Sequence, residues 1–334
     1  MVLDILKPIL CTAEMNDEHM ASGYPVIDKK VLIFIIILWL LCLITVLCCG
    51  FIVVALGMEC LLRRTLSPYN KLLASLGVSR FCLQWVTIGK SIYTFLYPTA
   101  LLYDRMMQFL SFFWDFLNAY TIWSCTWLGF FYCVKIANFT HPVFLWLKGK
   151  VSGWIPWLLL SCVGFSGLTS ILFFTGNHIL YQNYLRGNCQ LWNATGHSMR
   201  SFEKLYFFFL KLTSFTIPLG VFLIFTVLLL ISLGRHMKKI LLTLSGFQDP
   251  PIQVHLRALL SIISFALLFT SSFLAQVLNS STNTPFQEVK HWVWQVVSHL
   301  CMAAHSLLLL FNNPRLRATL ERGCPKVWGM LSCS

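Results

Sequence analysis

Several ionisable residues lie inside long apolar stretches of the sequence, where a charge is costly, and three of them are candidates for a role. Asp115 and Lys211 belong to different stretches, and each lies about two helical turns from the end of its stretch. An isolated charge at the centre of a membrane helix costs roughly 2.5–3.5 kcal/mol. A salt bridge between Asp115 and Lys211 is therefore the favoured interpretation, and contact of one of them with a polar ligand is the alternative. Arg80 lies deeper, and we interpret it as a structural tie to carbonyl or hydroxyl groups of neighbouring helices.

An aromatic residue and an amide form a second candidate site. Trp114 and Asn118 are four positions apart, which places them one turn apart on the same face of a helix. An aromatic ring beside an amide suits a pocket for flat, partly polar molecules. Tryptophans near helix ends also anchor proteins at the membrane interface, so a pocket and an anchor are both open interpretations of Trp114.

Patterns for catalysis or metal binding are missing from the sequence. It contains no GxSxG, HExxH, P-loop or CxxC pattern. Many of the 13 cysteines lie in or beside apolar stretches, where they behave as small hydrophobic residues. We therefore predict that the protein is not an enzyme and that it has no cofactor.

The composition is that of a membrane protein. Hydrophobic residues make up 57% of the chain and charged residues 11%, whereas a soluble domain has about 25% charged residues. A formal net charge of +13 could indicate nucleic-acid binding. However, the basic residues are spread in small groups between the apolar stretches, as in the loops of membrane proteins. We exclude nucleic acid as a partner and predict the lipid bilayer as the environment.

Seven stretches reach the length of roughly 20 apolar residues that a membrane-spanning helix needs. Their approximate bounds are 31–56, 71–96, 106–133, 154–174, 205–233, 258–278 and 291–311. Runs such as VLIFIIILWLLCLITVL lack the polar–apolar alternation of a β-barrel strand. The predicted fold is an all-α membrane protein with an amino-terminal segment (1–30), a seven-transmembrane-helix domain (31–311) and a tail (312–334).

The charges between the spans predict the orientation. Lys and Arg are in excess in segments 57–71, 133–153 and 234–257 and in the tail, whereas the charges of the other set of segments balance. By the positive-inside rule, the amino terminus is extracellular and the tail cytoplasmic. The sequon Asn193-Ala194-Thr195 then lies outside, and we expect Asn193 to carry a glycan.

One segment is more specific than any membrane span requires. Residues 131–148 read FYCVKIANFTHPVFLWLK and begin where the third stretch ends. Residues 76–85 contain Ser79-Arg80 and Leu83-Gln84-Trp85, residues 249–259 contain Asp-Pro and His-Leu-Arg-Ala-Leu, and His305-Ser306 lies in the last span. In this order, these segments closely resemble the signatures of the taste receptor type 2 (bitter) family of seven-helix G-protein-coupled receptors. The Asp-Arg-Tyr and Asn-Pro-x-x-Tyr motifs of rhodopsin-like receptors do not occur.

The resemblance assigns roles to individual residues. Trp114, Asn118 and Gln295 match positions of the family's ligand pocket. Tyr132, Lys135 and His305 lie in its signature segments, with structural or activation roles.

Two departures from the family pattern are expected to matter. Cys49 replaces a usual Asn, so a polar partner of Arg80 is expected to be lost. Ser272 replaces a usual Tyr at a point linked to activation.

The function implied by the resemblance is that of a multi-pass plasma-membrane receptor. It would bind small bitter molecules in the outer half of the helical bundle and activate a gustducin-type heterotrimeric G protein. A vomeronasal-like chemosensory receptor is the alternative within receptors, and a membrane transporter is the alternative from another class.

Overall fold

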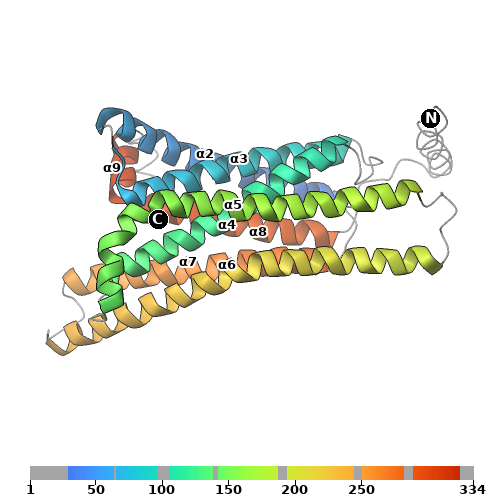
Figure 1. Cartoon of the computed structure of the whole chain (residues 1–334). Helices are drawn as coiled ribbons and strands as arrows, with labels where there is room; N and C mark the ends of the chain where they lie inside the picture. Colours follow the sequence, from blue (N-terminus) through green and yellow to red (C-terminus); the bar gives the residue numbers. More distant parts are fainter. Residues whose placement is uncertain are drawn as a thin grey trace.

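The computed structural model of the protein describes residues 29–63, 65–96, 105–137, 142–186, 194–243, 250–281 and 289–323. Within these residues, all regular secondary structure is α-helical, and the long helices run side by side in one bundle (Figure 1). The helices are α2 (Lys29–Arg63), α3 (Pro68–Leu96), α4 (Arg105–Ile136), α5 (Pro142–Arg186), α6 (Ala194–Thr243), α7 (Pro250–Ser281), α8 (Val289–Asn312) and α9 (Pro314–Gly323).

These helices overlap all seven predicted spans but are longer than most of them. The difference is largest for α5, which begins at Pro142 rather than near 154. Hydropathy marks only the part of a helix that lies in hydrocarbon, whereas the helix itself continues into the headgroup region. Proline is the first residue of α3, α5, α7 and α9. Its fixed φ angle and missing N–H suit the first helical position, so these prolines explain where the helices begin.

Among the described residues, six helices are long and apolar enough to cross a membrane: α2, α3, α5, α6, α7 and α8. The all-α membrane class is therefore confirmed. α4 has 32 residues, enough for the predicted span 106–133, but it has no membrane-length stretch as apolar as those of the six. Many of its polar residues are buried, including Asn118, Thr121, Ser124 and Thr126.

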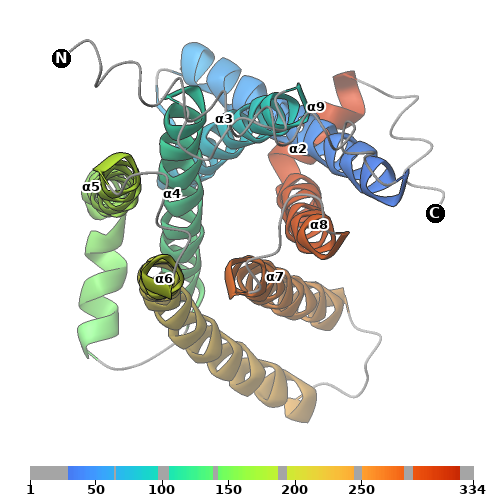
Figure 2. The ribbon, with the colours of Figure 1, turned by 90° about the vertical axis from the view of Figure 1, so that its right-hand side faces the viewer.

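α4 occupies the centre of the bundle. It packs against α3, α5 and α6, and Figure 2 shows it running between them. Much of the core consists of apolar side chains from α3, α4 and α5, among them Leu72, Leu76, Leu128, Val134, Val151 and Ile155. The outer faces carry large exposed hydrophobic residues such as Leu47 and Trp157, which suits lipid and not water. The central helix thus meets protein on several sides.

α6 bends along its length, and its later half runs away from the axis of the bundle (Figures 1 and 2). Pro218 lies inside this helix, and an internal proline removes one backbone hydrogen bond and kinks a helix. The Thr126 hydroxyl of α4 donates a hydrogen bond to the Pro218 carbonyl at 3.1 Å. Beside it, Gly129 of α4 faces the ring of Phe222. α4 and α6 are therefore tied together at the bend.

Candidate functional site

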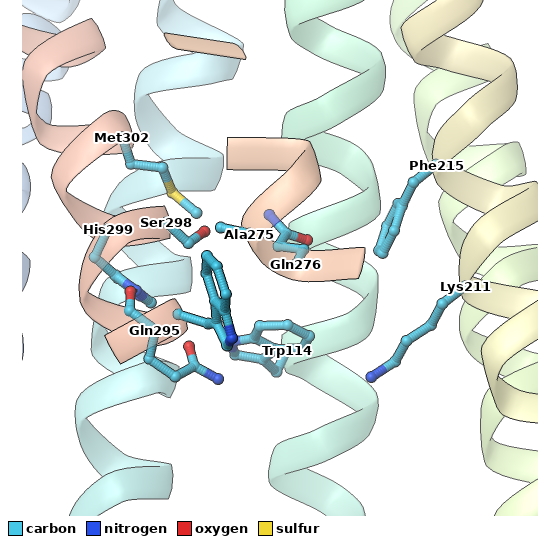
Figure 3. Close-up of a pocket in the computed structure, with 10 residues that line it drawn as sticks. Trp114, Lys211, Phe215, Ala275, Gln276, Gln295, Ser298, His299 and Met302 are labelled. Atoms are coloured by element: carbon cyan, nitrogen blue, oxygen red, sulfur yellow. The ribbon is translucent and has the colours of Figure 1, made fainter. Parts of the chain in front are cut away.

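A cavity of about 20 Å³ lies in the half of the bundle that is predicted to face outward. Trp114 of α4, Lys211 of α6 and Gln295 of α8 all line it. Figure 3 shows Trp114 and Gln295 close together and the Lys211 side chain directed toward them from the opposite helix. The structure thus brings three of the five predicted ligand-binding residues to one space.

Contacts with α3 orient the Trp114 ring. Its Nε1–H donates to the Thr87 hydroxyl at 3.2 Å. The Lys90 ammonium lies over the ring, 5.4 Å from its centroid, a cation–π arrangement that holds the indole in place. Trp114 therefore presents a fixed aromatic surface to the cavity.

Asn118 lies one turn further along α4 and serves a second cavity. It is buried, and its Nδ2 donates to Gln276 Oε1 of α7 at 2.9 Å. It lines a deeper space of about 30 Å³, together with Gln276 and Arg80. Gln276 and Met302 also line the outer cavity, so the two spaces adjoin at these residues.

Asp115 lines neither cavity, but it is the centre of a charged group. Its negative charge interacts with the positive charges of Lys211 and Lys90. Within the described residues, no ion pair within 4.0 Å joins it to either lysine. The structure therefore places a second lysine beside the predicted Asp115–Lys211 pair, and direct pairing stays a prediction.

Several residues that line the outer cavity were not predicted from the sequence. They are Phe215, Ala275, Gln276, Ser298, His299 and Met302. Gln276 and His299 are polar residues in apolar stretches, a signal that could have identified them. The apolar residues resemble those that face lipid, so sequence alone could not single them out.

The outer cavity is small in this conformation. Sites that enclose drug-sized ligands measure about 300–1,000 Å³, far more than the 20 Å³ seen here. The Trp114, Gln295 and Lys211 side chains close the space, so a ligand of that size needs them or their helices to move.

Arg80 forms a buried network near the deeper cavity. Its guanidinium donates to the Ser306 hydroxyl at 3.1 Å and to the Cys125 sulfur at 3.3 Å, and it contacts His305 Nδ1. The His305 ring also stacks on Phe265, with 4.1 Å between centroids. Arg80 of α3 thus contacts side chains of α4 and α8, and its role as a structural tie stays a prediction.

The remaining predicted residues make defined contacts between helices. The Tyr132 hydroxyl donates to the Tyr69 hydroxyl at 3.0 Å, which joins α4 to α3. The Lys135 ammonium donates to the Lys148 carbonyl at 3.3 Å, which joins α4 to the first turns of α5. Ser272 of α7 lies 3.3 Å from the Ser298 hydroxyl of α8. The sequon residue Asn193 lies outside the described residues.

Comparison with known proteins identifies the family. The family model for taste receptor protein (TAS2R) matches residues 26–326. The chain is 54% identical over 320 residues to taste receptor type 2 member 135 of Rattus norvegicus, covering 96% of this chain and 100% of the relative. It is 56% identical over 308 residues to member 60 of Homo sapiens, covering 92% of this chain and 97% of the relative. The chain belongs to the taste receptor type 2 family.

Membership of this family confirms the resemblance and settles the class of the protein. It is a multi-pass bitter taste receptor of the plasma membrane, and the family is one of receptors rather than enzymes. In this taste receptor, Cys49 donates to the Ser306 hydroxyl at 3.6 Å. Since Ser306 in turn accepts from Arg80, Cys49 reaches the guanidinium through a hydroxyl.

Proposed function

We propose that this receptor binds small bitter molecules at the outer cavity and that binding activates a gustducin-type G protein. The observation that carries the proposal is the convergence of Trp114, Lys211 and Gln295 from three helices on one space. An aromatic surface, an amide and a cation can together hold flat molecules that carry a few polar groups.

The proposed arrangement has seven membrane spans, namely the six apolar helices and α4. Its amino terminus is extracellular. α4 is long enough to cross the bilayer, and its buried polar residues face neighbouring helices rather than lipid. Epitope tags at the two ends, stained on intact cells, test the orientation. The amino-terminal tag should stain and the carboxy-terminal tag should stain only after permeabilisation; the reverse pattern would overturn the arrangement.

Signal transfer would run from the cavity to the inner ends of α6 and α7. Lys211 and Phe215 of α6 and Ala275 and Gln276 of α7 line the cavity, so an occupant contacts both helices. A ligand that prefers one arrangement of these helices shifts the receptor toward it. α6 already diverges from the bundle beyond its proline (Figures 1 and 2), which makes its inner half a suitable element to open a cleft for the G protein.

The test is a panel of bitter compounds applied to cells that express the receptor with a gustducin-like chimeric G protein. The expected result is agonist-dependent calcium release without net uptake of the compound. Uptake without calcium release would instead favour a transporter. Calcium release that persists without the chimera would point to another G protein.

Variants then locate the ligand. Trp114→Ala should raise the agonist concentration for half-maximal response by about tenfold or more at equal surface expression, since it removes a contact worth roughly 1–2 kcal/mol. Asn118→Ala should also raise it, because Gln276 of the outer cavity loses the amide that holds it. Trp157→Ala is a matched control, because this tryptophan of α5 lies on an exposed face. Unchanged potency in the Trp114 variant for several unrelated agonists would move the pocket elsewhere.

A further inference from the structure

The deeper cavity has donor groups that the protein does not satisfy. Arg80 and His305 both line this space of about 30 Å³. Both residues are almost fully buried, with 2% and 4% of their surfaces exposed. Within the described part of the chain, Arg80 Nε and His305 Nε2 have no hydrogen-bond partner. Unsatisfied buried polar atoms are rare in folded proteins, so each needs an explanation.

The contact between these two residues decides which atoms carry protons. A guanidinium group has only donors, so His305 Nδ1 must accept from Arg80. A histidine that accepts at Nδ1 is neutral and carries its proton on Nε2. The two unsatisfied atoms, Arg80 Nε and His305 Nε2, are therefore both N–H donors.

The charge of Arg80 is also unbalanced. Its recorded partners are a hydroxyl, a sulfur and a neutral imidazole. No carboxylate among the described residues forms an ion pair with it. A buried charge is normally paired, because removing an ion from water costs several kcal/mol. The missing element is a negative charge.

We propose that the deeper cavity is a binding site for a small monovalent anion of about the size of chloride. The space has room for one small ion, since it exceeds the roughly 10–15 Å³ that a single buried water molecule needs. Arg80 Nε–H and His305 Nε2–H donate to the anion, and the guanidinium supplies the opposite charge.

The test uses the purified full-length receptor and neither an agonist nor a G protein, so it is independent of the function proposed above. Thermal unfolding is followed during titration of sodium chloride against sodium gluconate at constant ionic strength. A ligand that binds only the folded state raises the unfolding midpoint. We expect chloride to raise the midpoint by about 2 °C or more and the effect to saturate. Equal midpoints in the two salts would show that the cavity holds only water.

A matched pair of variants assigns the effect to this cavity. His305→Phe allows the aromatic stack on Phe265 to persist and removes both ring nitrogens, that is, the Nε2–H donor and the Nδ1 acceptor of Arg80. His299→Phe makes the same change at another buried histidine of α8, which lines the outer cavity. Chloride dependence should weaken in the first variant and persist in the second. A His305→Phe receptor with full chloride dependence would place the anion elsewhere and overturn the proposal. If that variant does not fold, anomalous scattering from bromide beside Arg80 in the wild-type receptor, or its absence there, decides the question.

Discussion

The contact between Gly129 and Phe222 should control how closely α4 and α6 approach. A methyl group added at Gly129 would lie 2.9 Å from Phe222 Cδ2 and 3.0 Å from Cε2. Carbon atoms pack at about 3.5–4.0 Å, so the ring must retreat by about half an ångström. Phe222 is fully buried and packs on Phe265 and Phe269, with centroids 5.0 and 4.6 Å away. Because these neighbours block the ring from moving away, Gly129→Ala should push α6 and α7 outward.

The expected cost follows from this overlap. Overpacking of a core costs about 1–3 kcal/mol, and replacing a helical Gly by Ala gains at most roughly 1 kcal/mol. Gly220→Ala is the control, because a methyl group at this position of α6 meets no atom within 4 Å. Both variants share the propensity gain, so the difference between them isolates the overlap. We expect the Gly129→Ala unfolding midpoint to lie about 2–6 °C below that of Gly220→Ala.

A second substitution tests the cause. Phe222→Leu removes the ring edge that the new methyl would meet, so adding it to Gly129→Ala should recover part of the loss. Non-additivity of this kind marks two residues in direct contact. The reasoning is refuted if Gly129→Ala and Gly220→Ala have the same midpoint, or if the two losses at Gly129 and Phe222 simply add.

Three further predictions concern other contacts. Tyr132→Phe should lower the free energy of unfolding by about 1 kcal/mol, seen as a lower unfolding midpoint. Tyr69→Phe should cost at least as much, because the Tyr69 hydroxyl also contacts Asn313. A double variant whose loss equals the sum of the two would show that the hydroxyls do not act as a pair. Asp115→Asn and Lys211→Met should each reduce surface expression, and the double variant should recover part of it; losses that add would separate the two charges. Asn193→Gln should abolish a glycosidase-sensitive gel shift of the wild type, and a wild type without such a shift would remove the predicted glycan.

Much of the fold could be predicted because the long apolar runs are separated by polar segments. The ends of the helices could not be predicted, since the apolar run marks only the part of a helix in hydrocarbon. α5, for example, begins at Pro142, well before its apolar run. α4 was predicted as a span from its run of mostly apolar residues, yet among the long helices described it is the one without a stretch apolar enough to stand out as a span. Its polarity has a cause that one sequence does not reveal, namely burial against α3, α5 and α6.

Residues of the candidate site could be predicted where their type is unusual in an apolar stretch or where they match a family position. Lys211 was identified because a charge is costly in an apolar stretch, and Trp114 and Gln295 because they match family positions. The partnerships were harder to predict. That Lys90 lies over Trp114, or that Asn118 pairs with Gln276, depends on how far each helix is rotated in the bundle. Helical periodicity shows which residues share one face of a helix. It does not show which other helix packs against that face.

The central position of α4 has a consequence for how the receptor is made. On the seven-span arrangement, a ribosome delivers α4 to the membrane after α2 and α3 and before α5 and α6. Asn118 then has no Gln276 to bond, because that partner is still unsynthesised. Lipid cannot satisfy the Asn118 amide. We expect α4 to remain at the insertion machinery until later helices emerge, so that this helix enters the bilayer as part of a group and not alone.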